Sequence, residues 1–510
     1  MPAVTRRPAL IALLLAVVLV GAGLVSYALV SGDDEAALPK ATGETGPDGL
    51  RPFYTQTVKW SDCGDGRCAD VKVPIDYDKP EGETTTVRVK DIPAEGKGGR
   101  YLFVNPGGPG GVATTFADYL HGQLPDAVLD EYDIVGVDPR GVGASDPLKC
   151  FGDRRFDDFA ASDPTPDDAA EIEAFRSDYT ELGKACERKD GELAAHVSTE
   201  EAARDLDVVR ALMGSTTFDW FGASYGTQLG ATYATLFPEK VGRMVLDGAV
   251  DPSLSAEDGA LGQATGFGRA IRAYVEDCVQ KSSCPLGRDP DVALQRLSDL
   301  LASADASPLR TGEDRKLTEG LMFYGVAVTL YDKKTWPVLT QALQLGLQRN
   351  GSLFLKLADA YFQRGSDGHF ASNIGESIYA VSCLDTEDHS TVAEVKASIP
   401  RFEKVSPVFG KALAWGVLGC ASWPIKPTHP QIPIDASGSE PILVLGTTRD
   451  PATPYEWAKA LTAQLKTGVL VTREGDGHTA YAAGNECINE KVDAYLVSGK
   501  VPKDGTVCKA

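Results

Sequence analysis

A serine with a glycine two places to either side lies at Ser224, between Gly222 and Gly226. The aromatic residues 218–221 before it predict a strand, and residues 227–234 after it predict a helix. On so tight a strand-to-helix turn, side chains at the two glycine positions would collide with neighbouring backbone, and the serine is held clear of the sheet. The N-terminal dipole of the helix favours negative charge at the same place. The pattern therefore predicts that Ser224 is a nucleophile.

A nucleophilic serine needs a base to accept its proton and an acid to orient that base. Asp450 and then His478 follow predicted strands late in the chain, in the order and placement expected after such a turn. Asp247, at the end of the predicted strand 244–246, is an alternative acid. We favour Asp450 for its place in the loop after the predicted strand 441–445, and we expect Asp247 to cap a turn.

Two backbone N–H groups are needed to stabilise the negative charge that develops on the attacked carbonyl oxygen. We expect one from Tyr225, the residue after the nucleophile, and one from Gly108 in the glycine-rich turn 105–111. A dinucleotide fingerprint is the alternative for this turn, because Gly108, Gly110 and Ala113 have its spacing after a strand. It is disfavoured because a proline within the turn removes an N–H that a phosphate needs, and no acidic residue follows at the proper distance.

Strand and helix signals alternate on both sides of Ser224, which is typical of a mostly parallel sheet with helices on its faces. Residues 101–104 and 132–137 are continuous apolar runs, as expected for strands that are buried on both faces. Helical spacing dominates from about 251 to 437, and strand signals then return. The prediction is an α/β domain interrupted by a large, mainly helical cap. Its parts are a leader at 1–32, a flexible tether at 33–52, the α/β domain at 53–250 and 438–510, and the cap at 251–437.

The leader carries an export signal. Arg6 and Arg7 precede an apolar run over 8–30, which is either cleaved as a signal peptide or retained as a membrane anchor. We therefore expect a protein that is secreted or anchored to the outer face of the cell membrane. The formal charge of −22 argues against a nucleic-acid partner, whose phosphates require a basic face.

The ten cysteines support the same compartment, because an even number in an exported chain predicts disulfides. Sequential pairing is the simplest of many possible connectivities. A zinc site is the alternative, but the chain has no C-x-x-C motif and its histidines are few and scattered. We expect no metal and no cofactor. The sequential pairs are Cys63 with Cys68, Cys150 with Cys186, Cys278 with Cys284, Cys383 with Cys420, and Cys487 with Cys508.

Several motifs stand in an order that is more specific than any of them alone. They are 105–111, 137–145, 222–226, 450–454 and 477–478. Through them the chain resembles the tripeptidyl aminopeptidase group of α/β-hydrolases, relatives of the prolyl aminopeptidases, over nearly the whole exported part. The resemblance implies an α/β-hydrolase fold and the removal of short peptides, often tripeptides, from free N-termini of peptides or proteins.

One departure from that group is Val112-Ala113, where the family often has Ser-Gly, and it could alter the entrance to the site without moving Gly108. We expect Asp138 and Arg140, in the second motif, to be structural residues that tie their loop to the glycine turn.

An aminopeptidase must recognise an ammonium group, which calls for carboxylates at a fixed distance from Ser224. Glu376 and Asp385 in the predicted cap are candidates, and ordinary solvated acids are the alternative interpretation. Two other functions remain open. One is a secreted carboxylesterase or lipase with the same three residues, because nucleophile and fold are shared across substrates. The other is a catalytically inactive fold used as a binding protein.

Overall fold

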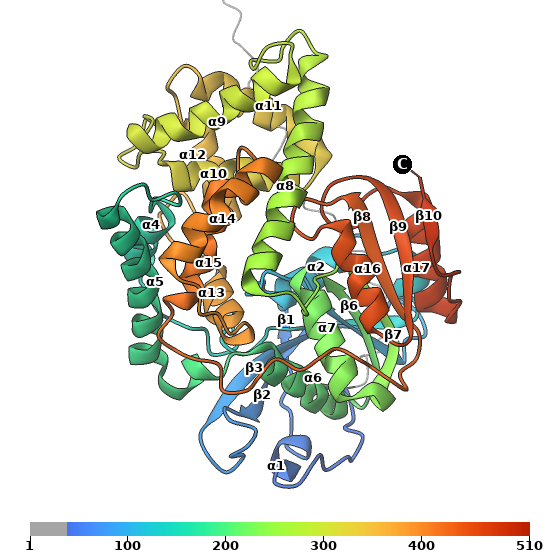
Figure 1. Ribbon diagram of the computed structural model, residues 1–510. Coiled ribbons are helices and arrows are strands. Elements are labelled where there is room, and N and C mark those ends of the chain that lie inside the picture. Colours follow the sequence, from blue (N-terminus) through green and yellow to red (C-terminus); the bar gives the residue numbers. More distant parts are fainter. Residues whose placement is uncertain (1–37, 510) are drawn as a thin grey trace, which may run out of the picture. The chain divides into compact units, whose positions relative to one another are not determined.

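One sheet of ten strands runs through the part of the chain that the structure describes. The computed structural model describes residues 38–509 (Figure 1). The strand order is β1-β2-β3-β5-β4-β6-β7-β8-β9-β10. The strands are β1 (Ser61–Cys63), β2 (Gly66–Pro74), β3 (Thr84–Ile92), β4 (Arg100–Asn105), β5 (Tyr132–Val137), β6 (Phe218–Ala223), β7 (Val241–Asp247), β8 (Ile442–Arg449), β9 (Gly468–Asp476) and β10 (Thr506–Cys508).

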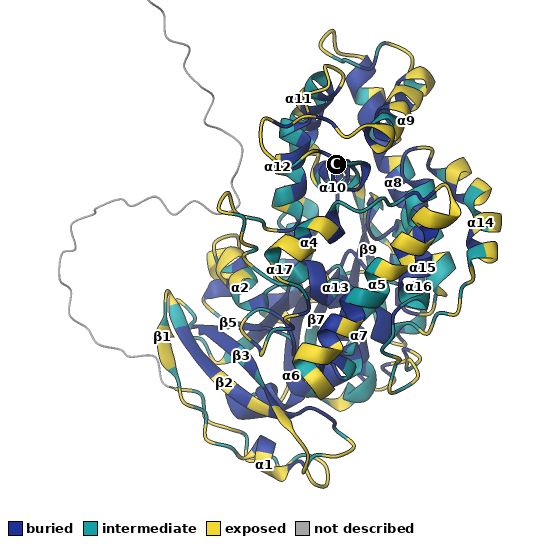
Figure 2. Ribbon diagram, turned by 90° about the vertical axis from the view of Figure 1, so that its left-hand side faces the viewer, coloured by how far each residue is buried: buried dark blue, intermediate teal, exposed yellow. Residues whose placement is uncertain are grey.

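Strands β4 to β10 are parallel to one another, which confirms the mostly parallel sheet. Every residue of β6 is buried, and so are the last four residues of β4, β5 and β7 (Figure 2). Parallel strands with helices on both faces are buried on both sides, and this is why they appear in the sequence as continuous apolar runs.

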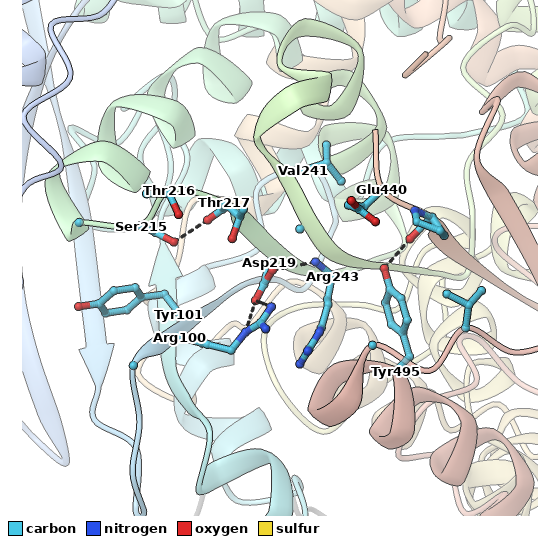
Figure 3. Close-up of a pocket in the computed structure, with 16 residues that line it drawn as sticks. Arg100, Tyr101, Ser215, Thr216, Thr217, Asp219, Val241, Arg243, Glu440 and Tyr495 are labelled. Atoms are coloured by element: carbon cyan, nitrogen blue, oxygen red, sulfur yellow. Dashed lines mark hydrogen bonds and ion pairs between the residues drawn. The ribbon is translucent and has the colours of Figure 1, made fainter. Parts of the chain in front are cut away.

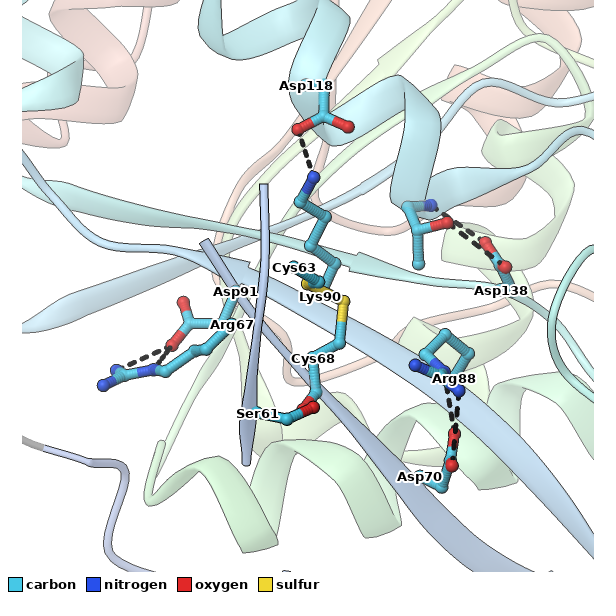
Figure 4. Close-up of a disulfide and its surroundings, with 11 residues drawn as sticks. Ser61, Cys63, Arg67, Cys68, Asp70, Arg88, Lys90, Asp91, Asp118 and Asp138 are labelled. Atoms are coloured by element: carbon cyan, nitrogen blue, oxygen red, sulfur yellow. Dashed lines mark hydrogen bonds and ion pairs between the residues drawn. A yellow bond between two sulfur atoms is a disulfide. The ribbon is translucent and has the colours of Figure 1, made fainter. Parts of the chain in front are cut away.

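The first three strands are antiparallel and form one edge of the sheet. Their burial alternates along β3, as expected where one face is more exposed than the other. Figure 4 shows the Cys63–Cys68 disulfide at this edge, where the paired ends of β1 and β2 meet. Nearby, Arg67 binds Asp91 at 2.7 Å. These polar, alternating strands carry a weaker sequence signal than the apolar parallel ones.

Helices cover the two faces of the sheet. Leu102 and Val104 of β4 pack in one apolar cluster with α2, α3 and α17, whereas Phe103 between them packs in another with α6, α7 and α16. This alternation follows from the two-residue period of a strand. The helices that accompany the sheet are α1 (Arg51–Tyr54), α2 (Ala113–His121), α3 (Asp126–Leu129), η1 (Gly191–Ala195), α6 (Thr199–Met213), α7 (Tyr225–Leu236), η2 (Pro238–Lys240), α16 (Tyr455–Gln464) and α17 (Glu486–Ser498).

The ends of α6 illustrate how local sequence sets the boundaries. Ser198 accepts the N3 amide of Glu201, and the Glu201 carboxylate accepts the Ser198 amide in return, so two otherwise unpaired N–H groups are satisfied. Gly214 ends the helix in the left-handed conformation at φ 82°, which glycine adopts without strain. A side chain there would also overlap the carbonyl of Lys40.

A helical region lies between β7 and β8 in the chain. Its elements are α8 (Ala256–Val279), α9 (Pro290–Ala306), α10 (Glu319–Ala327), η3 (Val328–Leu330), η4 (Lys333–Thr335), α11 (Trp336–Gly346), α12 (Ser352–Tyr361), α13 (Ile374–Asp385), α14 (Val392–Val405) and α15 (Gly410–Ala421). The Cys383–Cys420 disulfide joins α13 to α15. We refer to this region as the cap.

Two helices that precede Ser224 in the chain also belong to the cap layer. They are α4 (Asp153–Ala160) and α5 (Ala169–Asp190), which Figure 1 shows beside α13, α14 and α15. Ile172 and Phe175 of α5 pack with Trp415 and Leu418 of α15 in a separate apolar cluster. The helical layer is therefore larger than the predicted cap at 251–437, because apolar helix faces can be completed by segments distant in sequence.

The segment 39–50 differs from the predicted tether. The Glu44 carboxylate binds Arg210 at 2.9 Å and Lys240 at 2.9 Å, and the Thr42 N–H donates to Ala211. These contacts hold the segment on the α/β domain despite its composition. The predicted leader at 1–32 lies outside the described residues. Among residues 38–509, no helix combines the length and apolar character needed to cross a bilayer.

The ten cysteines form five disulfides between sequential partners, the simplest of the possible connectivities. Disulfides persist in oxidising compartments, so this content indicates a protein that works outside the cytoplasm.

Candidate active site

Ser224 occupies the turn between β6 and α7, with φ 56° and ψ −123°. Its backbone N–H donates to the Asp247 carbonyl at 2.8 Å, which fixes the turn against β7. A side chain at Gly222 would overlap the Gly226 carbonyl, and one at Gly226 would lie 2.9 Å from the Asn105 carbonyl. Both glycines are therefore required by close approach, and the strained serine is what the elbow geometry imposes.

His478 and Asp450 lie together, as their order in the sequence predicts. The Nδ1 atom of His478 is 2.9 Å from each carboxylate oxygen of Asp450. Asp450 is 2% exposed and also accepts the N–H groups of Ala452, Thr453 and Thr479, so its carboxylate is held in one orientation. An imidazole oriented in this way presents its Nε2 atom as the proton acceptor.

Electrostatics favour the charged form of the imidazole. Burial opposes that charge, but the negative charge of Asp450 and its hydrogen bond to Nδ1 outweigh burial and raise the pKa of His478 above its usual value. Asp247 contributes in the same direction from a greater distance. An imidazole stabilised as a cation is the partner that a serine needs when it loses its proton.

Asp247, the alternative acid, binds backbone rather than His478. Its carboxylate accepts the N–H of Ala480 at 2.8 Å and that of Tyr481 at 2.8 Å. Burial raises the pKa of Asp247 to about 6 despite these bonds. Asp247 therefore anchors the loop that carries His478, which is the structural role expected for it.

His478 lies beside Gly248, the residue that follows β7. A side chain at Gly248, where φ is +68°, would lie 3.2 Å from the Cε1 atom of His478. Because Asp247 holds the Ser224 amide, the imidazole and the serine share one end of β7. The structure thus gathers Ser224, Asp450 and His478 at the carboxyl edge of the parallel sheet.

The glycine turn after β4 packs directly on the elbow. A side chain at Gly107 would lie 2.8 Å from the Cβ atom of Ser224 and 3.0 Å from the Tyr225 nitrogen. The Gly107 N–H is occupied by the Asn105 side chain at 2.9 Å, whereas Gly108 is exposed. Within residues 38–509, neither the Gly108 nor the Tyr225 N–H donates a hydrogen bond. Both N–H groups are therefore available for the oxyanion-binding role that the sequence predicts for them.

Asp138 and Arg140 have separate structural tasks. The Asp138 carboxylate accepts the Thr114 N–H at 2.9 Å, which ties its loop to the helix after the glycine turn. Arg140 is 1% exposed and binds Asp205 at 2.6 Å and the His196 carbonyl at 3.0 Å. Arg140 therefore ties the loop to α6 and not, as the sequence led us to expect, to the glycine turn.

The candidate ammonium ligands bind the protein's own groups. Both Glu376 oxygens accept backbone N–H groups, from Cys150 and Phe151. Asp385 accepts the Thr199 N–H at 2.8 Å. Burial raises the pKa of each carboxyl to about 7, because these bonds only partly replace water.

Tyr331 is a residue at this site that the sequence does not reveal. Its carbonyl accepts the backbone N–H of His478 at 2.8 Å, and the two rings lie 5.3 Å apart. Close by, Lys333 binds Asp476 at 3.2 Å, so the cap holds the histidine loop at two points. No local pattern connects residues so far apart in the chain, and only packing brings them together.

A cavity of about 500 Å³ lies elsewhere, at the amino ends of β4, β6, β7 and β8. Figure 3 shows Arg100 bound to Asp219 in this cavity, with Arg243 and Tyr495 nearby. The cavity lies at the sheet edge opposite Ser224. It is therefore separate from the candidate site.

Comparisons with known proteins agree with this geometry. Residues 101–337 match the alpha/beta hydrolase fold family, and residues 406–508 match the TAP-like protein family. The serine protease Hip1 of Mycobacterium tuberculosis is 35% identical over 90% of this chain and 92% of its own length. Carboxylesterase B of the same species is 34% identical, with 95% and 97% covered. The tripeptidyl aminopeptidase of Streptomyces lividans is 32% identical, with 88% and 86% covered. The chain is thus a serine hydrolase of the alpha/beta hydrolase fold, and it belongs to the TAP-like protein family.

Proposed function

We propose that this protein is an exported serine exopeptidase that removes short peptides, three residues long, from free N-termini. The observation that carries the proposal is the His478–Asp450 pair at 2.9 Å, gathered with Ser224 at one end of β7. The names of the relatives, serine protease and tripeptidyl aminopeptidase, support the peptide as substrate.

The reaction proceeds in two steps. Ser224 Oγ attacks the peptide carbonyl while His478 Nε2 accepts its proton, and the oxyanion binds the N–H groups of Tyr225 and Gly108. The C–N bond then breaks as His478 gives the proton to the leaving amine. Water, deprotonated by the same imidazole, attacks the acyl-enzyme and releases the short peptide. Asp450 keeps Nδ1 protonated and stabilises the imidazolium in both steps.

The proposed ammonium site does not include Glu376 or Asp385. The hydrogen bonds of both carboxylates go to internal N–H and side-chain groups, and this favours a structural role. Selection of a free N-terminus must then come from other residues of the cap.

The test is a peptide ladder with a free N-terminus, read by mass spectrometry beside its N-acetylated twin. Loss of successive tripeptides from the free ladder alone is the expected result. Equal cleavage of both ladders would exclude recognition of the ammonium group. The Ser224→Ala variant is the control, and it must leave both ladders intact.

A carboxylesterase is the second candidate, because a relative that covers 95% of this chain carries that name. Turnover of p-nitrophenyl esters without cleavage of either ladder would favour it. The five disulfides support export, with peptide or protein N-termini as substrates outside the cytoplasm. N-terminal sequencing of the mature protein distinguishes a secreted form from one retained on the membrane by the leader.

A further inference from the structure

Five tyrosines of the cap layer form a connected group that starts at His478, and we call this group the tyrosine wall. Its members are Tyr331 after η3, Tyr361 at the end of α12, Tyr324 in α10, Tyr379 in α13 and Tyr179 in α5. The Tyr331 ring is 5.3 Å from the imidazole, and the Tyr361 ring is 4.9 Å from that of Tyr324. At the far end, the Tyr379 and Tyr179 rings lie 5.3 Å apart.

The hydroxyl groups of the wall bind one another. The Tyr324 and Tyr379 oxygens are 3.0 Å apart, and the phenols of Tyr361 and Tyr331, like those of Tyr379 and Tyr179, lie close enough to shift each other's pKa. Buried tyrosines elsewhere behave differently, since Tyr54 and Tyr233 both donate to the Asp207 carboxylate. A phenol can donate and accept, so hydroxyls paired only with each other can exchange those bonds for bonds to a peptide.

Each tyrosine of the wall lies deep in the protein and yet keeps some solvent exposure. Burial is the largest cause of the raised pKa of all five phenols, which shows how much protein surrounds them. The five side chains are only partly buried, however, whereas the neighbouring Phe156, Phe159 and Phe362 are buried. The five rings therefore form a partly exposed aromatic surface that a substrate can contact.

Both ends of the wall are tied to the surroundings of Ser224. At one end, the Tyr331 carbonyl binds the His478 N–H. At the other, α13 carries Tyr379 and also Ser377, whose Oγ atom any side chain at Gly110 would overlap. The wall thus extends from the candidate base to the helix that supports the glycine turn.

We propose that the tyrosine wall is the subsite for the acyl-side residues of the substrate, and that it selects aromatic and aliphatic side chains over acidic ones. This inference rests on the proposed function of Ser224 and His478. The ring faces stack with apolar side chains, and the hydroxyls bind the substrate's peptide groups. An acidic side chain on these rings would lose water, and the five phenols offer it no positive charge in return.

The test uses tripeptide p-nitroanilides that carry Phe or Asp at each position in turn. Wild type is expected to prefer Phe at one or more positions. The Tyr361→Ala variant should lose about tenfold or more in kcat/KM for the Phe substrates and little for the Asp substrates. Tyr361→Phe, which keeps the ring, should have a kcat/KM for the Phe substrates between those of wild type and Tyr361→Ala. Tyr274→Phe is the matched control, because this cap tyrosine donates to or accepts from Thr340 and lies outside the wall.

Hydrolysis of p-nitrophenyl acetate reports on Ser224, His478 and Asp450 separately, because its two-carbon acyl group has no side chain for the wall to bind. Unchanged acetate turnover in Tyr361→Ala, with a lower Phe-to-Asp ratio, is the expected result. An unchanged ratio, or an equal loss for acetate and peptides, would overturn the proposal. If wild type cleaves no peptide, a 3-phenylpropionyl ester replaces the peptides. If Tyr361→Ala then lowers the turnover of this ester, the wall remains a subsite although the peptidase function is excluded. If the turnover is unchanged, both proposals are rejected.

Discussion

The Tyr331 carbonyl accepts the backbone N–H of His478 at 2.8 Å, and the ring of the same tyrosine lies 5.3 Å from the imidazole. A residue of the cap therefore holds the proposed base in place, and the α/β domain alone does not complete the site. The cap has two tasks here, since the tyrosine wall that starts at Tyr331 also reaches away from Ser224.

We expect Tyr331→Ala to differ from Tyr361→Ala. Loss of the ring that packs on His478 should lower kcat for p-nitrophenyl acetate and for peptides alike, by about tenfold, because misplacement of the base affects every substrate. Tyr331→Phe retains the ring and should keep most of the acetate activity. Steady-state kinetics on both substrates measure the difference. Normal acetate turnover in Tyr331→Ala would show that the backbone contact alone positions the histidine.

Replacement of Ser224 should separate activity from stability. Ser224→Ala is expected to lose about 10⁶-fold in kcat, as for removal of a serine nucleophile elsewhere, while its Tm stays close to wild type. Ser224→Gly should be equally inactive but more stable than the alanine variant by about 1 kcal/mol, because φ 56° strains any residue with a side chain. Thermal unfolding of the two variants decides this, and equal Tm values would argue against strain at the elbow.

The pH profile should report the Asp450–His478 pair. The raised pKa of His478 places the acid limb of kcat/KM above about 6.5, because only the neutral imidazole accepts the serine proton. Asp450→Asn removes the charge that raises this pKa, so its limb should move to lower pH while kcat falls by about 10⁴-fold. Asp247→Asn is the comparison: Asp247 also raises this pKa but makes no hydrogen bond to the ring, so its replacement should move the limb less than Asp450→Asn does. A limb unmoved by Asp450→Asn would exclude Asp450 as the orienting acid.

Asp385 should make the protein less stable as pH rises. Its pKa is raised to about 7 in the folded protein, mainly by burial, whereas an unfolded aspartate titrates near 3.9. Between these values the folded state binds more protons than the unfolded state, so the free energy of unfolding decreases with rising pH. Asp385→Asn cannot ionise; its amide oxygen can still accept the Thr199 N–H, while its NH2 group replaces the oxygen that accepts the Thr199 hydroxyl. Denaturant unfolding at pH 5 and pH 7.5 should show a smaller decrease for the variant, and parallel decreases would assign the effect to other carboxyls.

The parallel strands and the site residues next to them were predictable because a local sequence pattern indicates each of them. The strands β4 to β9 each contain an apolar stretch, and Ser224, Asp450 and His478 each follow such a strand in the expected order. Asp247 was also placed correctly as a structural residue by its position at the end of β7. Such patterns indicate only the conformation of the chain within a few residues of each position.

No local sequence pattern indicates which distant segments of the chain contact each other. Helices α4 and α5 have ordinary amphipathic faces, and nothing in them indicates that α15 is their partner. Glu376 and Asp385 illustrate the same limit, because acidic residues in a helical cap look alike whether they face a substrate or buried N–H groups. The composition of 39–50 predicted a tether, yet ion pairs of Glu44 hold it on the fold.

The position of the cap between β7 and β8 also orders events during synthesis. Residues leave the ribosome from the N-terminus, so the elbow at Ser224 emerges long before Asp450 and His478. Residues 248–441 separate β7 from its pairing partner β8, and His478 follows β8 in the chain. The proposed base is therefore synthesised only after β8. With the proposed roles, a nascent or truncated chain carries a nucleophile that has no proton acceptor. On this proposal, hydrolytic activity requires the chain to be complete through His478 and β8 to have paired with β7.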